Sequence, residues 1–400
     1  MLCNRPQKQY IWYLSILCLL FLVLLCCLQN GSKEDKDYIV NMSIVSKENE
    51  TLKANISALG MELKHIKEYK KKETEKWTAI LQKFVETTAS RSVENLLQKC
   101  PCVVITGPFG CGKSSIAFRT AFQFEQTYGY DILVVLKPAD VIKFASTKDK
   151  QLFLIDDVFG KYSGNEIDIA WWSTHNKSVG YILSRNNNIK LLMTCRSNIY
   201  KSATSGHISF PFVEVSFISD SNKLSLNERK EICQSYLTQS VYKQLTDKDL
   251  SLYYFFPSLC VNLPDDASQI NVKRFFQIPY DIVSFEIKRI DKSNLAYLVL
   301  ALLCIKDNNV DKTFFAEESL DDKKLLMELS DELGYTVSPR KQLLLEVFNA
   351  LEDTFFKSTE YAFKCIEHHM FEIIAYEVAG SILRSLIKYG SKSFLKDRVF

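Results

Sequence analysis

Residues 107–114 read GPFGCGKS, that is, Gly107, Pro108, Phe109, Gly110, Cys111, Gly112, Lys113 and Ser114. The stretch follows the pattern G-x-x-x-x-G-K-[ST], and it lies between an apolar run at 102–106 and a helical pattern that starts at Lys113. Glycines let the backbone wrap a phosphate group, so that N–H groups and the start of the helix face its negative charge. The order of strand, loop and helix favours this interpretation over a chance glycine-rich turn.

Each polar side chain at the end of the loop has a predicted partner. Lys113 is expected to reach the β and γ phosphates of a nucleoside triphosphate, and the Ser114 hydroxyl is expected to bind Mg²⁺. Ser115 extends the same nucleotide-binding surface by one residue.

Short apolar runs alternate with helical patterns on both sides of the loop. The runs that predict strands are 102–106, 132–136, 152–155, 189–194 and 212–217. Strands that are apolar on both faces, joined by crossover helices, predict a parallel α/β sheet. Amphipathic helical patterns dominate after Ser225, so an all-α region is expected to follow the sheet.

Two carboxylates come directly after the run at 152–155. Because the carboxyl ends of parallel strands form the edge where nucleotides bind, Asp156 and Asp157 are expected near the loop. Asp156 is predicted to be a second-sphere ligand of Mg²⁺, and Asp157 is predicted to be the general base for an attacking water. Taken without the loop, the pair would more simply start a turn.

Arg196 closes the next strand, in the segment Thr194-Cys195-Arg196, and would reach the same sheet edge. It is predicted to sense or stabilise the γ phosphate as a catalytic residue together with Lys113 and Asp157. An arginine paired with a neighbouring carboxylate explains the same residue equally well.

The composition sets outer limits on function. With 400 residues, 47% of them hydrophobic and 24% charged, the chain is large enough for two or three packed domains. A formal net charge of +3 gives no global field that would favour nucleic acid, so no nucleic-acid partner is expected. The twelve cysteines lack a repeated C-x-x-C spacing, which favours buried reduced thiols over a disulfide framework or a zinc site.

The N-terminus has the pattern of a membrane anchor. Residues 11–28 contain no charge and are flanked by lysine and arginine, which predicts a single transmembrane helix. A cleavable signal peptide is the alternative, but small residues would be expected where Cys26, Cys27 and Leu28 close the run.

A heptad pattern follows the anchor. Its apolar or tolerated positions are Val45, Asn49, Leu52, Ile56, Leu59, Leu63 and Ile66. This spacing predicts a coiled-coil stalk at 44–75 and therefore a homo-oligomer. A single amphipathic stalk helix remains the alternative, because the pattern has few heptads and Gly60 interrupts it.

Several blocks of sequence together resemble one known family. They are 84–87 (FVET), 103–107 (VVITG), 156–162 (DDVFGKY), 194–197 (TCRS), 224–229 (LSLNER), 256–260 (FPSLC) and 276–280 (FQIPY). These blocks are similar to the novel STAND NTPase type 3 family, within the STAND and AAA-like P-loop NTPases. The resemblance runs from about Trp77 to Phe400.

The resemblance implies a domain order and a function. It implies a P-loop NTPase core at 77–218, a helical lid at 219–290 and a winged-helix-like helical domain at 291–400. It implies ATP with Mg²⁺ as ligands, Pro257 near the adenine, and a signalling switch that hydrolyses ATP to ADP slowly while it changes conformation or oligomerises. The chain stops at Phe400 without the effector domain or repeat array of many relatives, so an unknown protein partner is expected.

Two other functions remain open. One is a nucleotide-binding scaffold without significant hydrolysis, in which Asp157 is structural. The other is a P-loop kinase, which the long helical C-terminal half and the lack of an arginine-rich lid disfavour.

The side of the membrane is the least consistent prediction. ATP-dependent switching and the unpaired cysteines favour a single-pass membrane protein whose globular part is cytosolic. Four glycosylation sequons, at Asn30, Asn41, Asn49 and Asn55, and the basic residues before the span favour the opposite orientation.

Overall fold

The computed structural model describes residues 50–398, except 56, 59, 63, 67, 69, 73, 76, 79–80, 136–138, 161–165, 198, 201–211, 265–270, 317–318 and 353. The predicted membrane helix at 11–28 lies outside the described residues, as does the first part of the predicted stalk. Within the part that is described, no helix combines the length and the apolar character needed to cross a bilayer.

The chain divides into two units, Met1–Ile66 and Lys67–Phe400. All described residues of the first unit are helical. Leu52, in the predicted heptad seam, is 56% exposed in the single chain. The coiled-coil association of several chains stays a prediction.

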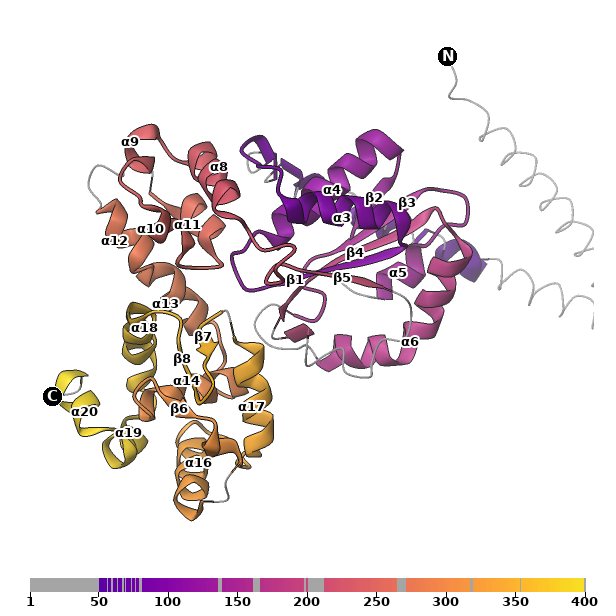
Figure 1. The fold of residues 1–400 in the computed structure, drawn as a ribbon. Coiled ribbons are helices and arrows are strands. Elements are labelled where there is room, and N and C mark those ends of the chain that lie inside the picture. Colours follow the sequence, from indigo (N-terminus) through magenta and orange to yellow (C-terminus); the bar gives the residue numbers. More distant parts are fainter. Residues whose placement is uncertain are drawn as a thin grey trace, which may run out of the picture. The chain divides into compact units, whose positions relative to one another are not determined.

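The second unit contains the predicted sheet. Its five parallel strands are ordered β2-β3-β4-β1-β5 (Figure 1). The strands are β1 (Cys102–Gly107), β2 (Asp131–Val134), β3 (Gln151–Ile155), β4 (Ile189–Arg196) and β5 (Val213–Ser216). Every residue of β1 and β3 is buried, as expected of strands covered on both faces. The parallel α/β sheet is therefore confirmed.

Helices cover both faces of this sheet (Figure 1). Helices α3 (Thr88–Lys99) and α4 (Lys113–Tyr128) lie on one face, and α5 (Ala139–Phe144) and α6 (Glu166–Arg185) lie on the other. Apolar side chains of α3 and α4 form one core with alternate residues of the strands. Parallel pairing of β1 with β4 places Gly107 next to Arg196 at the carboxyl edge.

The rest of the second unit is mainly helical. First come α8 (Leu226–Tyr236), α9 (Gln239–Tyr242), α10 (Asp247–Ser251), α11 (Phe256–Asn262), α12 (Val272–Gln277) and α13 (Tyr280–Lys288). We call residues 226–288 the lid. Then follow α14 (Leu295–Ile305), β6 (Val310–Asp311), α15 (Thr313–Ala316), α16 (Leu320–Glu332), α17 (Lys341–Ala350), β7 (Phe356–Ser358), β8 (Ala362–Cys365), α18 (His368–Ala379), α19 (Leu383–Tyr389) and α20 (Lys392–Arg398).

One hydrophobic core joins the lid to the C-terminal helices. Helix α14 lies deep in it, because all its residues from Ala296 to Ile305 are buried. Strands β6, β8 and β7 form a small antiparallel sheet beside these helices. The helical region predicted to follow the sheet is thus confirmed.

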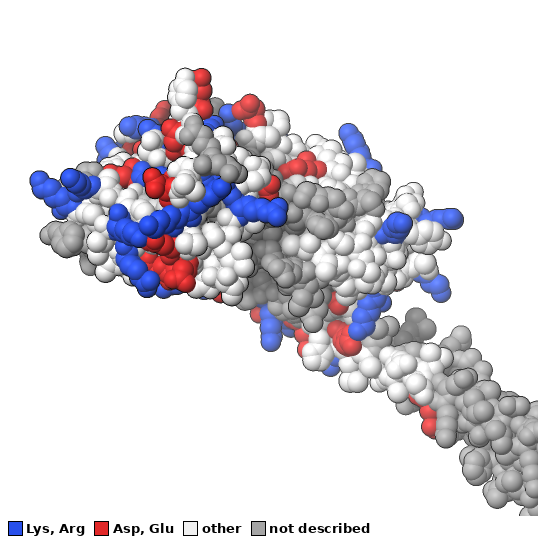
Figure 2. Space-filling model, turned by 90° about the horizontal axis from the view of Figure 1, so that it is seen from below, with Lys and Arg blue, Asp and Glu red and all other residues white. Residues whose placement is uncertain are grey.

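Charged side chains on the helical half lie in mixed clusters. Figure 2 shows acidic groups next to basic ones on this part of the surface. One such pair joins Lys388 to Glu328 at 2.6 Å, and Asp322 accepts from both Lys306 and Lys341. Mixed charges of this kind keep the local field weak.

The described cysteines are free thiols. They are Cys100, Cys102, Cys111, Cys195, Cys233, Cys260, Cys304 and Cys365, and all but Cys100 are buried. The prediction of buried free thiols is confirmed for the described cysteines other than Cys100.

Candidate functional site

The loop between β1 and α4 has the backbone shape that its glycines permit. Gly110 and Gly112 have φ angles of 67° and 96°, in the left-handed region that favours glycine. Helix α4 starts immediately afterwards at Lys113, so its free N–H groups face the concave side of the loop. The Lys113 Nζ donates to the carbonyl oxygen of Pro108 at 2.7 Å, and the side chain is buried.

The end of the loop is tied to the carboxyl edge of the sheet. Ser114 Oγ donates to Asp156 Oδ1 at 2.8 Å, and Thr194 Oγ1 donates to the same oxygen at 2.5 Å. The structure thus brings the two predicted magnesium-binding residues into direct contact. Thr194 is fully buried and holds the Asp156 carboxylate from the neighbouring strand.

Asp157 lies in a turn after β3. Its φ of 49° is in the left-handed region, which aspartate adopts more readily than most residues other than glycine. The Asp157 N–H donates to Thr194 Oγ1 at 2.8 Å, and the Val158 N–H donates to the Thr194 carbonyl at 2.9 Å. Thr194 therefore positions both aspartates.

Arg196 is paired with the lid. Its Nη1 donates to Glu286 Oε2 of α13 at 2.8 Å, and each side chain is only 12% exposed. The sequence left open whether this arginine faces a phosphate or a carboxylate, and in this structure it faces the carboxylate.

The phosphate-binding loop is packed against the lid. Phe109 is buried in the core of the helical half, with its ring stacked on Phe255 at a centroid distance of 4.7 Å. The Ser258 N–H donates to the Gly110 carbonyl at 3.2 Å. A Cβ atom on Gly110 would come within 2.8 Å of the Cβ atoms of Phe255 and Ser258. The lid can therefore approach this closely only because position 110 is glycine.

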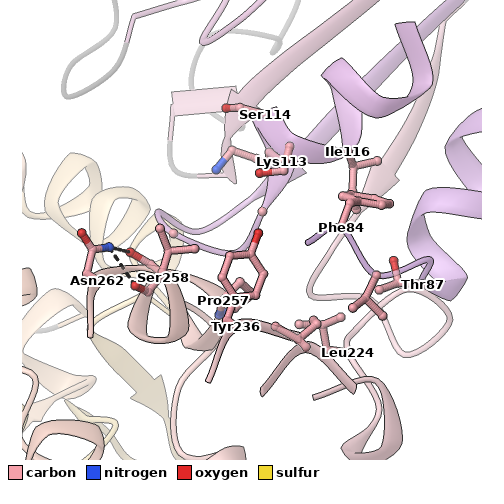
Figure 3. A pocket seen from close by; sticks show the side chains of 16 residues that line it. Phe84, Thr87, Lys113, Ser114, Ile116, Leu224, Tyr236, Pro257, Ser258 and Asn262 are labelled. Atoms are coloured by element: carbon pink, nitrogen blue, oxygen red, sulfur yellow. Dashed lines mark hydrogen bonds between the residues drawn. The ribbon is translucent and has the colours of Figure 1, made fainter. Parts of the chain in front are cut away.

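A cavity of about 270 Å³ opens beside the loop (Figure 3). Lys113 and Ser114 border it on one side, and Pro257, near the start of α11, borders it on another. Most of the remaining lining is apolar, with a few polar groups. The other lining residues are Phe84, Val85, Thr87, Gly110, Gly112, Ser115, Ile116, Leu224, Ile232, Tyr236, Ser258, Val261 and Asn262. The cavity has the mixed character of a small-molecule site.

Helix α8 of the lid is bound to the start of α3 and to the segment before it. Glu228 accepts a hydrogen bond from the Thr88 N–H at 2.6 Å, and Ser235 Oγ donates to the Lys83 carbonyl at 2.7 Å. Burial works against the charged form of Glu228, but the hydrogen bonds from Thr88 and Ser225 outweigh it and lower the pKa of this carboxyl. Glu228 is therefore an anionic link between lid and core.

The residues at the sheet edge suit a magnesium ion. Hydroxyl and carboxylate oxygens are the ligands that Mg²⁺ prefers, and Ser114 and Asp156 supply them side by side. Among the described residues, no three His, Cys, Asp or Glu side chains are grouped so that they alone could hold a metal. An ion here would complete its ligand sphere with phosphate oxygens and water.

Apart from Asp157, the predicted site residues fall into three groups. The first group lines the cavity and consists of Gly110, Gly112, Lys113, Ser114, Ser115 and Pro257, with Asp156 in contact with Ser114. Gly107, Pro108, Phe109 and Cys111 shape the loop from behind, where burial raises the pKa of the Cys111 thiol. Arg196 lies at the same sheet edge but is turned to Glu286.

Sequence reasoning did not single out three residues of the site. Thr194 lies at the end of an apolar strand, and a polar residue in that place is the signal that could have identified it. Glu286 and Tyr236 belong to amphipathic helices, and nothing local distinguishes them from other surface-facing residues.

Residues 84–239 match the family model described as Novel STAND NTPase 3. This range contains the loop, both aspartates, Arg196 and helix α8. The resemblance inferred from the sequence blocks is confirmed over these residues. None of the curated proteins matches the chain.

Solved structures with a similar arrangement share little sequence with this chain. A Walker-type ATPase of Pyrococcus abyssi has 10% identity and a TM-score of 0.43, with 72% of this chain and 94% of that chain covered. The ORC2 protein of Aeropyrum pernix, in ADPNP–ADP complexes, has 10% identity and a TM-score of 0.38, with 74% and 93% covered. The RuvB Holliday junction branch migration motor of Thermotoga maritima has 15% identity and a TM-score of 0.35, with 74% and 96% covered.

Proposed function

We propose that this STAND-type P-loop NTPase is a membrane-anchored signalling switch, in which ATP bound with Mg²⁺ rearranges the sheet domain against the lid and is hydrolysed slowly to ADP. The observation that carries the proposal is the position of Phe109. This side chain belongs to the phosphate-binding loop, yet it is buried in the core of the helical half and stacked on Phe255. A loop that adjusts to a phosphate must therefore move the lid, or be resisted by it.

Each polar residue of the site has a role in this proposal. Lys113 exchanges the Pro108 carbonyl for the β and γ phosphates, which are far stronger partners for an ammonium group. Ser114 and Asp156 would hold Mg²⁺, which would supply positive charge to balance the β and γ phosphates. Asp157 accepts a proton from the water that attacks the γ phosphorus.

Arg196 is the residue that links the γ phosphate to the lid. A triphosphate at the loop competes with Glu286 for the guanidinium, because both are anions that it can bind in a bidentate manner. Release of Glu286 frees α13, which is also joined to α18 through the hydrogen bond from Ser284 to Glu377. Hydrolysis removes the competing anion and lets the ion pair form again.

The output of the switch is assigned to the N-terminal segment and the C-terminal helices. The heptad pattern at 44–75 supports a homo-oligomer, and the uncharged run at 11–28 supports a membrane anchor, with the globular part on the cytosolic side where ATP is available. The stacking of Trp77 on Phe118 of α4 gives the chain just after the stalk a contact with the loop's own helix. The order of helices and hairpin from α14 to β8 supports a winged-helix-like region. An unknown protein partner supplies the signal.

One observation favours the alternative function, a scaffold that binds nucleotide without significant hydrolysis. Asp157 has a left-handed backbone, and its N–H is engaged with Thr194, so the residue has a structural place in the turn. In that case ATP would stabilise the fold and would not be turned over.

Binding and single-turnover measurements on the full chain separate these functions. The switch predicts that Mg·ATP binds and releases phosphate slowly, that Lys113→Ala abolishes both, and that Asp157→Asn binds ATP but releases no phosphate. Equal ATP binding by the wild type and Lys113→Ala would refute the site. If the wild type releases no more phosphate than Asp157→Asn does, the switch is refuted and the scaffold is favoured.

A further inference from the structure

Among the described residues, Tyr236 is the one aromatic hydroxyl that the lid directs into the cavity beside the loop. It comes from the last residue of α8 and lines the cavity together with Pro257. Figure 3 shows its ring in the middle of the lining side chains, with the hydroxyl pointing toward the loop that carries Lys113 and Ser114. The residue thus lies where a group attached to a loop-bound phosphate would enter.

The ring is held from outside the cavity. The Lys83 ammonium lies 5.6 Å from the centroid of the Tyr236 ring, a cation–π contact. The neighbouring Ser235 is hydrogen-bonded to the Lys83 carbonyl. The Glu228 contact to Thr88 fixes the other end of the same helix. Tyr236 is therefore placed by its surroundings before any ligand binds.

The hydroxyl itself has no hydrogen-bonding partner among the side chains and backbone groups that the structure describes. Burial raises the pKa of this phenol, so it is neutral at ordinary pH and can both donate and accept. The hydroxyl is open to the cavity and is therefore available to a ligand.

The lining also limits which base can enter. The flat apolar walls of Phe84, Leu224 and Pro257 suit an aromatic ring system. Among the described residues that line the cavity, none carries a carboxylate. Guanine presents two adjacent N–H donors on one edge and is best read by a carboxylate, whereas adenine presents one amino group and one acceptor, which a neutral hydroxyl can satisfy.

We propose that Tyr236 contacts the nucleobase of the bound nucleotide, with its ring packed against an adenine and its hydroxyl hydrogen-bonded to the polar edge of that base. Tyr236 is then a specificity-determining residue of the lid. This inference rests on the proposed function, because it needs a nucleotide at the loop. It also means that α8 contacts the base, while α13 responds to the phosphates through the ion pair of Glu286 with Arg196.

Isothermal titration of the full chain with Mg·ATP, Mg·GTP and Mg·tripolyphosphate tests the proposal. Tyr236→Ala is expected to weaken the binding of ATP about tenfold or more, since stacking on a base is worth about 1–3 kcal/mol. Tyr236→Phe is expected to weaken ATP about fivefold, as for one neutral hydrogen bond, and to reduce the preference for ATP over GTP. Tripolyphosphate has no base, so its affinity is expected to be the same in all three proteins.

Tyr242→Ala is the matched control. Tyr242 is also partly buried against the core of the helical half, but it does not line the cavity. It is expected to leave ATP affinity unchanged. Equal ATP affinity in Tyr236→Ala and the wild type would overturn the inference, as would equal losses for ATP and tripolyphosphate. A wild type that binds neither ligand would overturn the proposed function, and this inference with it.

Discussion

The guanidinium of Arg196, at the end of β4, donates to the carboxylate of Glu286 in α13 at 2.8 Å, and both side chains are largely buried. This ion pair spans 90 positions in the sequence and joins the nucleotide edge of the sheet to the lid. Because an arginine held by a carboxylate is less available to a phosphate, the pair is expected to weaken the binding of a triphosphate at this site.

Glu286→Gln is predicted to strengthen ATP binding about three- to tenfold, since Arg196 loses its anionic competitor and charged hydrogen bonds are worth about 1.5–3 kcal/mol. ADP binding is predicted to change much less. Fluorescence or calorimetric titration of the full chain measures both. Asp281→Asn, the same type of change at an exposed position of the same helix, is the control and should have no effect. Weaker or unchanged ATP binding by Glu286→Gln would argue against competition for the arginine.

Gly110→Ala is predicted to disturb the contact between loop and lid. The new Cβ would meet Phe255 and Ser258 at 2.8 Å, and position 110 also has a left-handed backbone. Gly129→Ala is a close control, because Gly129 has nearly the same φ, 69°, but open space around it. Both variants should be destabilised by roughly 1–2 kcal/mol, because alanine is strained in a left-handed backbone. Gly110→Ala should be destabilised by about 1–3 kcal/mol more through overpacking. Urea unfolding of the two variants gives the difference, and equal losses would mean that the close approach carries no energy.

Thr194→Val is predicted to impair turnover more than nucleotide binding. The valine has the same shape but cannot hold the Asp156 carboxylate or accept from the Asp157 N–H. Small misplacements of catalytic groups cost large factors, so phosphate release should fall about tenfold or more, with a higher Mg²⁺ requirement. Thr120→Val, at a buried threonine two turns into α4, is the control. Normal turnover by Thr194→Val would remove both aspartates from the proposed chemistry.

The Glu228 link predicts a specific pH dependence of stability. Its pKa is lowered in the folded chain, so its contribution is present above the ordinary value of 4.5 and is lost as the pH falls through the lower folded value. Glu228→Gln should therefore be less stable than the wild type at pH 7, by about 1–3 kcal/mol. The difference should shrink below about pH 4.5. Thermal unfolding between about pH 3 and pH 8 measures it, because this range extends below the ordinary pKa of a glutamate, with Glu231→Gln on the exposed side of α8 as the control. A difference that does not depend on pH would show that the charge of Glu228 is not involved.

The sequence predicted the sheet because the information is local. Each strand is a short run of apolar residues that satisfies both faces at once, and the glycine pattern of the loop has a fixed relation to the strand before it. Parallel pairing then brings Gly107, Asp156 and Arg196 to one edge. The position of Asp156 near the loop followed from that topology, and the structure adds its direct contact with Ser114.

The lid contacts could not be predicted in this way. A phosphate-binding loop tolerates almost any residue at the position of Phe109, and only the packing of the helical half shows that this side chain belongs to its core. Likewise, Glu286 and Tyr236 are positioned by the packing of helices that are distant in the sequence. The hydrophobic pattern around either residue therefore does not reveal its contacts.

Hydrogen exchange of the full chain in Mg·ATP and in Mg·ADP tests the coupling of the loop to the lid most directly. The amide exchange rates of α11 and α13 are expected to differ between the ATP-bound and the ADP-bound wild type. Lys113→Ala is expected to show no such difference. If the wild type binds ATP but exchange changes only in the loop and α4, the lid does not respond to the nucleotide and the switch is contradicted.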